Sequence, residues 1–201
     1  MKRIIIIFIL LLSISVNSQK KIVDNLDSLI TETRKSMKEK KITNYFIYTI
    51  NAFSNVGVVN EKDEDVGSYL LNDFKAYIFW KENSKCFIKA VDKVCKYQTL
   101  EIDECNFINI NKTTIDLMSK EIVLPLAEID NGKKVLIIEP IQSTTKFYFS
   151  QGNTIEFPHF YLNDLNKGNI NYNSNSKLTI NKLFQECQKL IYKKWNEIYK
   201  K

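Results

Sequence analysis

The sequence predicts an α+β domain built on an antiparallel meander of about six to eight strands, with N-terminal and C-terminal amphipathic helices packed on one face of the sheet. Three observations lead to this prediction. Amphipathic stripes lie near the two ends of the chain, β-branched and aromatic runs lie between them, and the connections between those runs are short. Short connections join antiparallel neighbours because a parallel return requires a crossover of about a dozen residues.

Residues 1–18 are typical of a secretory signal peptide. A short cationic start precedes an apolar run from Ile4 to Val16. The segment ends at Ser18 with small residues, or residues that a signal peptidase tolerates, at the positions that the peptidase reads. The run is shorter than the roughly 20 residues that span a bilayer. We expect cleavage before Gln19, a single domain over residues 19–201, a secreted or periplasmic location and no remaining transmembrane anchor. The alternatives are an uncleaved anchor or a buried N-terminal helix.

Cleavage changes what the net charge implies. The full chain has 29 Lys and Arg against 23 Asp and Glu, a net charge of +6. Loss of Lys2 and Arg3 with the signal leaves 27 basic residues against 23 acidic ones, a net charge of +4. Arg34 is then the last arginine in the chain. Because arginine is preferred for bidentate contacts to bases and phosphates, we expect no nucleic-acid partner.

The first half of the mature chain predicts one helix followed by a meander. Apolar residues at three- and four-residue steps, from Ile22 to Met37, predict an amphipathic helix over residues 21–40. Residues 60–65 are expected to form a charged loop closed by Gly67. Dense β-branched and aromatic runs predict strands over residues 42–53, 74–80, 86–91 and 94–102.

The second half predicts two hairpins between helices. A helix over residues 111–120 can be capped by Asn111 or Thr113. Asn131-Gly132 favours a hairpin turn. The expected hairpins pair residues 124–129 with 134–139 and residues 146–150 with 154–157, although the region 121–141 is the least clearly patterned. The Asn-rich segment 163–176 lacks a core pattern and is expected to be a loop, and residues 178–200 predict the last helix.

The four cysteines permit one or two disulfides in an exported chain. Cys86 and Cys95 fall on predicted adjacent strands and are the expected pair, while the pairing of Cys105 and Cys187 stays open. Cys187 lies in the apolar stripe of the last helix, where a buried thiol is the alternative. No two cysteines are closer than nine residues, so zinc and thioredoxin spacings are absent.

The scarce residues exclude several chemistries. His159 is the only histidine, so any Ser-His or Cys-His catalysis must use it, and we regard it as a weak catalytic candidate. The five glycines are scattered and form no phosphate-binding loop. The acidic segment 61–67 places Lys62 and Val66 where a calcium loop needs ligands. We therefore expect no cofactor and no metal.

Aromatic residues on the predicted strands are the remaining feature. Alternation along a strand distributes them over both sheet faces, so some are expected on a less covered face. Cross-strand packing is the alternative explanation. The candidate binding surface consists of Tyr77, Phe79, Trp80, Phe147, Tyr148 and Phe149.

Three functions follow from these observations. The first is a non-enzymatic exported binding domain whose partner is a protein, a peptide or a small apolar ligand. The second is an envelope or extracellular hydrolase that uses carboxylates or His159. The third is an immunity-type or inhibitor protein. No sequence motif assigns catalytic residues to the second, so the sequence favours the first.

Overall fold

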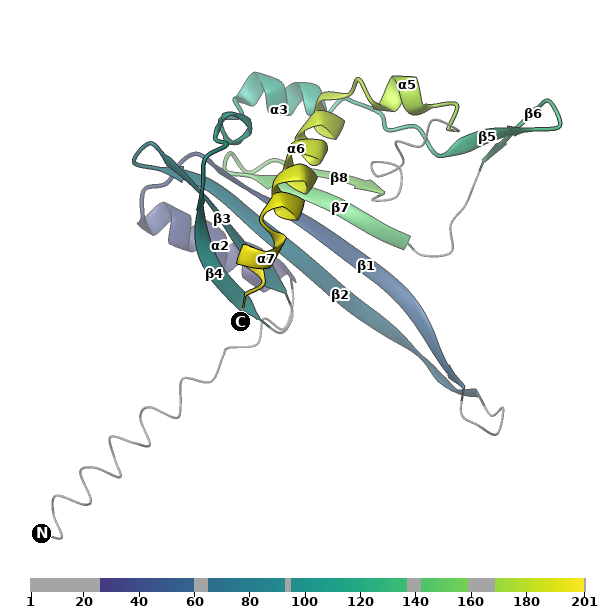
Figure 1. Ribbon diagram of the computed structural model, residues 1–201, viewed down its shortest axis with the longest axis horizontal. Coiled ribbons are helices and arrows are strands. Elements are labelled where there is room, and N and C mark those ends of the chain that lie inside the picture. Colours follow the sequence, from purple (N-terminus) through teal and green to yellow (C-terminus); the bar gives the residue numbers. More distant parts are fainter. Residues whose placement is uncertain (1–25, 60–64, 93–94, 137–141, 159–168, 201) are drawn as a thin grey trace, which may run out of the picture.

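The computed structural model describes residues 26–59, 65–92, 95–136, 142–158 and 169–200. Within these ranges the predicted α+β class is confirmed, with a six-stranded antiparallel sheet and a separate two-stranded hairpin (Figure 1). The sheet has the strand order β4-β3-β2-β1-β7-β8. The strands are β1 (Tyr45–Val59), β2 (Asp65–Glu82), β3 (Lys85–Asp92), β4 (Lys96–Ile102), β5 (Ala127–Asp130), β6 (Lys133–Leu136), β7 (Gln142–Phe149) and β8 (Thr154–Pro158). The helices are α2 (Leu26–Glu39), the 3₁₀ helix η1 (Asn106–Ile108), α3 (Lys112–Met118), α5 (Tyr172–Asn175), α6 (Thr179–Lys193) and α7 (Trp195–Ile198).

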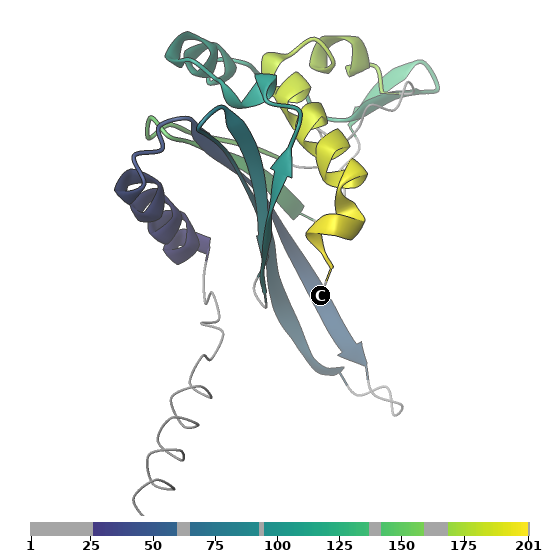
Figure 2. The same cartoon turned by 60° about the vertical axis from the view of Figure 1, so that its left-hand side comes forward.

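Helices cover both faces of the sheet. In β1, Phe46 and Tyr48 belong to the cluster under α6 and α7, whereas Tyr45 and Ile47 belong to the cluster under α2. Figure 2 shows α2 on one side of the sheet and α6 on the other. The prediction that both terminal helices pack on one face is therefore wrong. The reason is that four consecutive large apolar or aromatic residues place such side chains on both faces of a strand, and each face must be buried.

The two central strands are longer than the sequence predicted. β1 pairs with β7 only as far as Phe53, and β2 pairs with β3 only from Lys75 onward. Beyond these points β1 and β2 pair with each other alone and extend past the other strands (Figure 1). Residues 60–64 of the expected charged loop lie outside the described residues, while Asp65 and Gly67 belong to β2.

The predicted turn and cap chemistry is confirmed. Asn131 and Gly132 connect β5 to β6, and both have positive φ, 49° and 76°. Two successive residues with positive φ define the hairpin turn that Asn-Gly favours. At the start of α3, the Asn111 side-chain oxygen accepts a hydrogen bond from the Thr114 backbone N–H at 2.8 Å. Local residue chemistry therefore determines both features.

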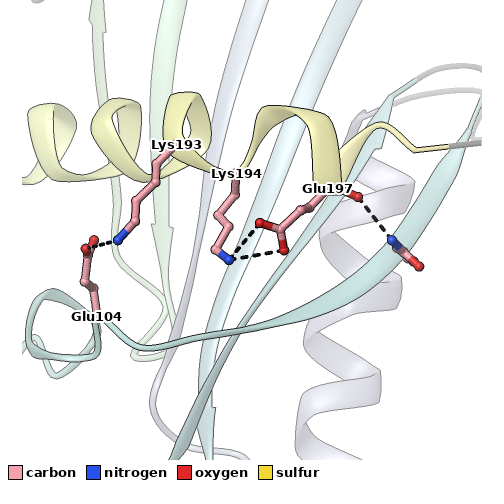
Figure 3. Close-up of polar contacts among 5 residues, drawn as sticks. Glu104, Lys193, Lys194 and Glu197 are labelled. Atoms are coloured by element: carbon pink, nitrogen blue, oxygen red, sulfur yellow. Dashed lines mark hydrogen bonds and ion pairs between the residues drawn. The ribbon is translucent and has the colours of Figure 1, made fainter.

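The predicted final helix is broken at Lys194 into α6 and α7. Figure 3 shows the contacts that hold this junction. Lys193 Nζ lies 2.7 Å from Glu104 Oε1, and Lys194 Nζ lies 2.8 Å from Glu197 Oε1. The Gln98 side-chain amide donates to the Glu197 carbonyl at 3.1 Å, which connects α7 to β4. These contacts thus connect α7 to β4, and the end of α6 to Glu104 just after β4.

The Asn-rich segment contains structure that the sequence did not predict. Residues 163–168 lie outside the described residues, but α5 lies within the rest of the expected loop. Asn175 is 1 % exposed, and its side chain both donates to and accepts from the backbone of Leu124, at 2.9 Å each. Asn171 Nδ2 donates to the Pro125 carbonyl at 2.7 Å. These side chains supply the hydrogen bonds that a neighbouring strand would otherwise give to residues 124–125.

Candidate functional site

The predicted aromatic binding surface is buried. Side chains from β2 and β7 divide between the two faces of the sheet and are covered by helices on each. Four of them pack under α6, whereas Trp80 and Tyr148 pack under α2. None is more than 9 % exposed, so the set forms no open surface. The buried residues under α6 are Tyr77, Phe79, Phe147 and Phe149.

The rings under α6 form a packed core, not a groove. Phe46 stacks on Phe79 with ring centroids 5.0 Å apart, and Tyr48 stacks on Phe147 at 5.1 Å. The hydroxyl of Tyr77 is satisfied within the protein, because it lies 2.6 Å from the Tyr199 hydroxyl. Burial raises the pKa of Tyr48 and of Tyr77. Both phenols therefore stay neutral to a higher pH than a free tyrosine does.

The disulfide joins Cys86 to Cys105 and leaves Cys95 and Cys187 as thiols. The expected pairing of Cys86 with Cys95 is therefore corrected. In the β3–β4 hairpin, Cys86 lies opposite Ile102, while Cys95 lies at the turn, where its carbonyl accepts from the Asp92 N–H. Residues paired across a hairpin are equally distant from its turn, and Cys86 and Cys95 are not. Cys187 is fully buried, which agrees with the alternative of a buried thiol.

The predicted catalytic candidate lies outside the described residues, so His159 has no structural assignment. In the described ranges, no group of three or more His, Cys, Asp or Glu side chains could hold a metal ion. A hydrogen bond from Lys193 and the charges of nearby lysines lower the pKa of Glu104. That carboxyl group is held ionised, which is unlike a general acid.

One cavity that could hold a small molecule lies between α2 and the sheet. It has a volume of about 200 Å³. Its apolar floor includes Leu29 and Met37 from α2 and Ile78 and Trp80 from β2. The cavity lies here because the apolar side chains of α2 pack on the sheet along the line of the helix. They leave a gap over β3 and β4. We call this gap the α2 cleft.

The rim of the α2 cleft is positively charged. Lys89 projects from β3 between its register partners Ile78 and Thr99, and Lys40 and Lys96 lie beside it. Burial, followed by the charges of Lys96 and Lys40, lowers the pKa of Lys89. Lys96 Nζ lies 3.3 Å from Glu32 Oε2. The rim therefore combines three lysines with one carboxylate, a balance that favours an anion.

Trp80, which lines the floor of the cleft, also carries an indole N–H. Its Nε1 is buried and has no hydrogen-bond partner in the described part of the protein. A buried donor without a partner costs about 1–3 kcal/mol. The ring itself is fixed by stacking on Phe87, with centroids 5.2 Å apart. An acceptor brought in by a ligand would remove this cost, so the indole N–H is a candidate contact.

One exposed apolar surface lies elsewhere in the structure. Both views show the β5–β6 hairpin projecting away from the sheet (Figures 1 and 2). Ile129 and Leu136 share one face of this hairpin and Val135 lies on the other, and all three are exposed. Apolar side chains grouped on a projecting hairpin are a common feature of protein contacts.

Comparisons with protein-family models, with curated proteins and with solved structures find no match to this chain. Among the helices that the structure describes, none has the length and apolar character needed to cross a membrane. The α2 cleft is the candidate site on the basis of its own residues. The sequence signal that could have located it is Lys89, a charged residue within the otherwise apolar run from Cys86 to Val91.

Proposed function

We propose that this chain is an exported, non-catalytic binding domain whose α2 cleft holds a small amphipathic carboxylate. The observation that carries the proposal is the combination of an apolar floor, an unpartnered Trp80 N–H and a rim of three lysines. Ligand sites usually join an apolar pocket to a few converging polar groups. The proposed binding site is therefore the flank of α2 and not the buried aromatic core.

The size of the cleft limits the ligand. A volume of about 200 Å³ exceeds the roughly 150 Å³ that accommodates benzene in an engineered cavity. A ligand with an apolar body of that size and one carboxylate would cover Ile78 and Trp80 while its charge meets Lys89. The disulfide between Cys86 and Cys105 supports export, because disulfides persist in oxidising compartments.

The proposal is tested by titrating the protein with octanoate, octanol and octylamine. The chain has two tryptophans, so a Trp195→Phe background leaves Trp80 as the fluorescent reporter in the cleft. We expect octanoate to change the Trp80 emission and to bind at least about tenfold more tightly than octanol, because a hydrogen bond to a charged group contributes about 1.5–3 kcal/mol. Octylamine should bind more weakly still.

Two variants give opposite expectations. Lys89→Gln should weaken octanoate binding, whereas Glu32→Gln should strengthen it by removing the carboxylate that competes for Lys96. Lys85→Gln is the matched control, since Lys85 is an exposed lysine four residues away on the same strand. Equal binding of octanoate and octylamine, or no effect of Lys89→Gln, would show that the cleft does not select an anion.

The partner-binding alternative, an immunity-type or inhibitor protein, is favoured by the exposed hairpin β5–β6. Its test is the isolation of a stoichiometric partner whose binding is lost in the double variant Ile129→Asp and Leu136→Asp. The hydrolase alternative stays a prediction from sequence, because its histidine lies outside the described residues.

A further inference from the structure

The other flank of α2 borders a second concavity. This open depression of about 570 Å³ lies between the C-terminal half of α2, the start of β1 and the β7–β8 turn. Three basic side chains and several neutral donors line it. They include Arg34, Lys38, Lys41, Tyr45, Ser150 and Gln151. We call it the Arg34 depression, and it shares no lining residue with the α2 cleft.

Arg34 lines this depression from α2. Its guanidinium lies over the Tyr148 ring, with Cζ 6.0 Å from the ring centroid. Its Nη2 is buried and has no hydrogen-bond partner among the residues that the structure describes. A buried guanidinium nitrogen without an acceptor is unfavourable, because the charged group loses its water and gains nothing in return. Such a nitrogen needs an acceptor that the described residues do not supply, and a ligand oxygen can provide it.

Two lysines add to the charge of Arg34. Lys38 lies one helical turn further along α2, on the same side of the helix as Arg34. Lys41 follows the end of the helix, where its N–H donates to the Lys38 carbonyl at 3.0 Å and the Ile42 N–H donates to the Met37 carbonyl at 2.9 Å. This hydrogen-bond pair is the helix-ending motif that favours glycine at the Lys41 position.

Lys41 occupies that position with a φ of 57°. A residue with a side chain is strained in this backbone region, so a lysine there calls for a reason. The negative end of the helix dipole accounts for a positive charge near the end of α2. It does not account for the unpaired nitrogen of Arg34, which lies further back in the helix.

The opposite wall of the depression supplies neutral groups. The turn between β7 and β8 brings the hydroxyl of Ser150 and the amide of Gln151 to the depression. The Ser150 N–H donates to the Tyr45 carbonyl at 3.1 Å, which fixes this turn against β1. Burial raises the pKa of Tyr45, and the nearby charge of Arg34 opposes that rise. The Tyr45 phenol therefore stays protonated and can donate a hydrogen bond.

We propose that the Arg34 depression binds a phosphate ester, with Arg34 contacting two phosphate oxygens and Lys38 and Lys41 adding charge. The planar guanidinium matches the geometry of a phosphate, and two ammonium groups beside it favour a group with more than one negative charge. A volume of about 570 Å³ is larger than a bare phosphate needs and leaves space for the attached organic group. The ester can be a soluble metabolite or a lipid headgroup.

The test has two arms that separate these sources. In the first, the protein is titrated with glycerol 3-phosphate by calorimetry. In the second, it is sedimented with phosphatidylcholine vesicles that contain or lack phosphatidic acid, whose headgroup is a phosphate monoester. Binding of glycerol 3-phosphate alone assigns a soluble ester, and binding only to the vesicles with phosphatidic acid assigns a headgroup. Binding in neither arm overturns the proposal.

Variants distinguish a built site from a diffuse positive surface. Arg34→Lys keeps the charge but loses the paired contact, so we expect binding to weaken by about tenfold. Lys38→Gln should weaken it by a few-fold, and it serves as the second variant if Arg34→Lys does not fold. Lys35→Gln removes an exposed lysine of α2 that does not line the depression and should leave binding unchanged. An equal loss in Lys35→Gln, or full binding by Arg34→Lys, overturns the proposal.

The proposal does not depend on the function of the α2 cleft. Arg34→Lys should leave octanoate binding unchanged, and Lys89→Gln should leave phosphate-ester binding unchanged. The two proposals can therefore be refuted independently of each other. Circular dichroism of each variant confirms that a loss of binding does not reflect a loss of fold.

Discussion

Glu121 caps the helix that begins at Thr179. Its Oε1 accepts a hydrogen bond from the Thr179 backbone N–H at 2.7 Å, and its Oε2 accepts one from the Ile180 N–H at 2.8 Å. The residue at the N-cap position itself, Leu178, makes no side-chain capping bond. A carboxylate from a distant segment thus performs the task that a local Ser or Asp usually performs. It also places a negative charge at the positive end of the helix dipole.

Removal of this cap should destabilise the protein measurably. We expect Glu121→Ala to lower the free energy of unfolding by about 1–2 kcal/mol, because two backbone N–H groups lose their acceptors. Glu121→Gln should cost less, since one acceptor oxygen remains. Urea unfolding followed by circular dichroism measures both changes. Glu128→Ala, an exposed site on β5, is the control and should stay within about 0.5 kcal/mol of the parent.

The buried asparagine of α5 gives a second stability prediction. Asn175→Leu should lower the free energy of unfolding by about 2–4 kcal/mol, because the N–H and the carbonyl of Leu124 both lose their partners. The matched control is Asn173→Ala, at an exposed position of the same short helix. If the two variants unfold at the same urea concentration, the contacts with Leu124 do not contribute to stability.

The disulfide should be important for stability. It joins Cys86 and Cys105 across a sequence separation of 19 residues. The double variant Cys86→Ala and Cys105→Ala should therefore lose about 3 kcal/mol of unfolding free energy, mainly through a less restricted unfolded chain. Cys95→Ser should change stability little. Peptide mapping without reduction checks the pairing, and a fragment linking Cys86 to Cys95 would contradict it.

The two thiols should differ in reactivity. Cys187 is fully buried, and burial raises its pKa well above the usual value, so little thiolate forms. Cys95 is partly exposed at the β3–β4 turn. We expect an alkylating reagent to modify Cys95 in the folded protein and Cys187 only after unfolding. Mass spectrometry of the labelled peptides measures the difference, and rapid labelling of Cys187 in the native state would contradict the packing of α6.

At alkaline pH the protein should unfold as its core tyrosines ionise. Burial raises the pKa of Tyr48 and Tyr77 in the folded state, whereas in the unfolded chain a tyrosine ionises at about pH 10. The stability that these groups contribute is complete below about pH 10 and is lost as the pH rises further, because the unfolded chain releases protons that the fold retains. Phenolate absorbance and far-ultraviolet circular dichroism should change together.

A matched variant isolates one of these groups. Tyr77→Phe removes a buried phenol that hydrogen-bonds to Tyr199, so the alkaline loss of stability should become less steep. Complete ionisation of the ten tyrosines of the chain without a change in circular dichroism would contradict the burial of Tyr48 and Tyr77.

The sequence determined the local elements of this protein. The α+β class, the Asn111 cap, the Asn131-Gly132 turn and the β7–β8 hairpin could all be predicted. Each depends on residues that are close together in the chain, whose hydrogen bonds and backbone preferences act over a few positions. The predicted secretory signal and the predicted domain boundary at Gln19 stay predictions, since both lie in residues 1–25, outside the described ranges.

The tertiary structure decided how those elements meet. It placed α2 and α6 on opposite faces of the sheet, paired Cys86 with Cys105, and connected Asn175 to Leu124 across 51 residues. It also brought Lys89, Lys96 and α2 together around one cleft. These relationships join residues that are distant in sequence, and they follow from which apolar faces must be buried together. Periodicity shows that a helix or strand has such a face, whereas only packing in three dimensions determines which partner covers it.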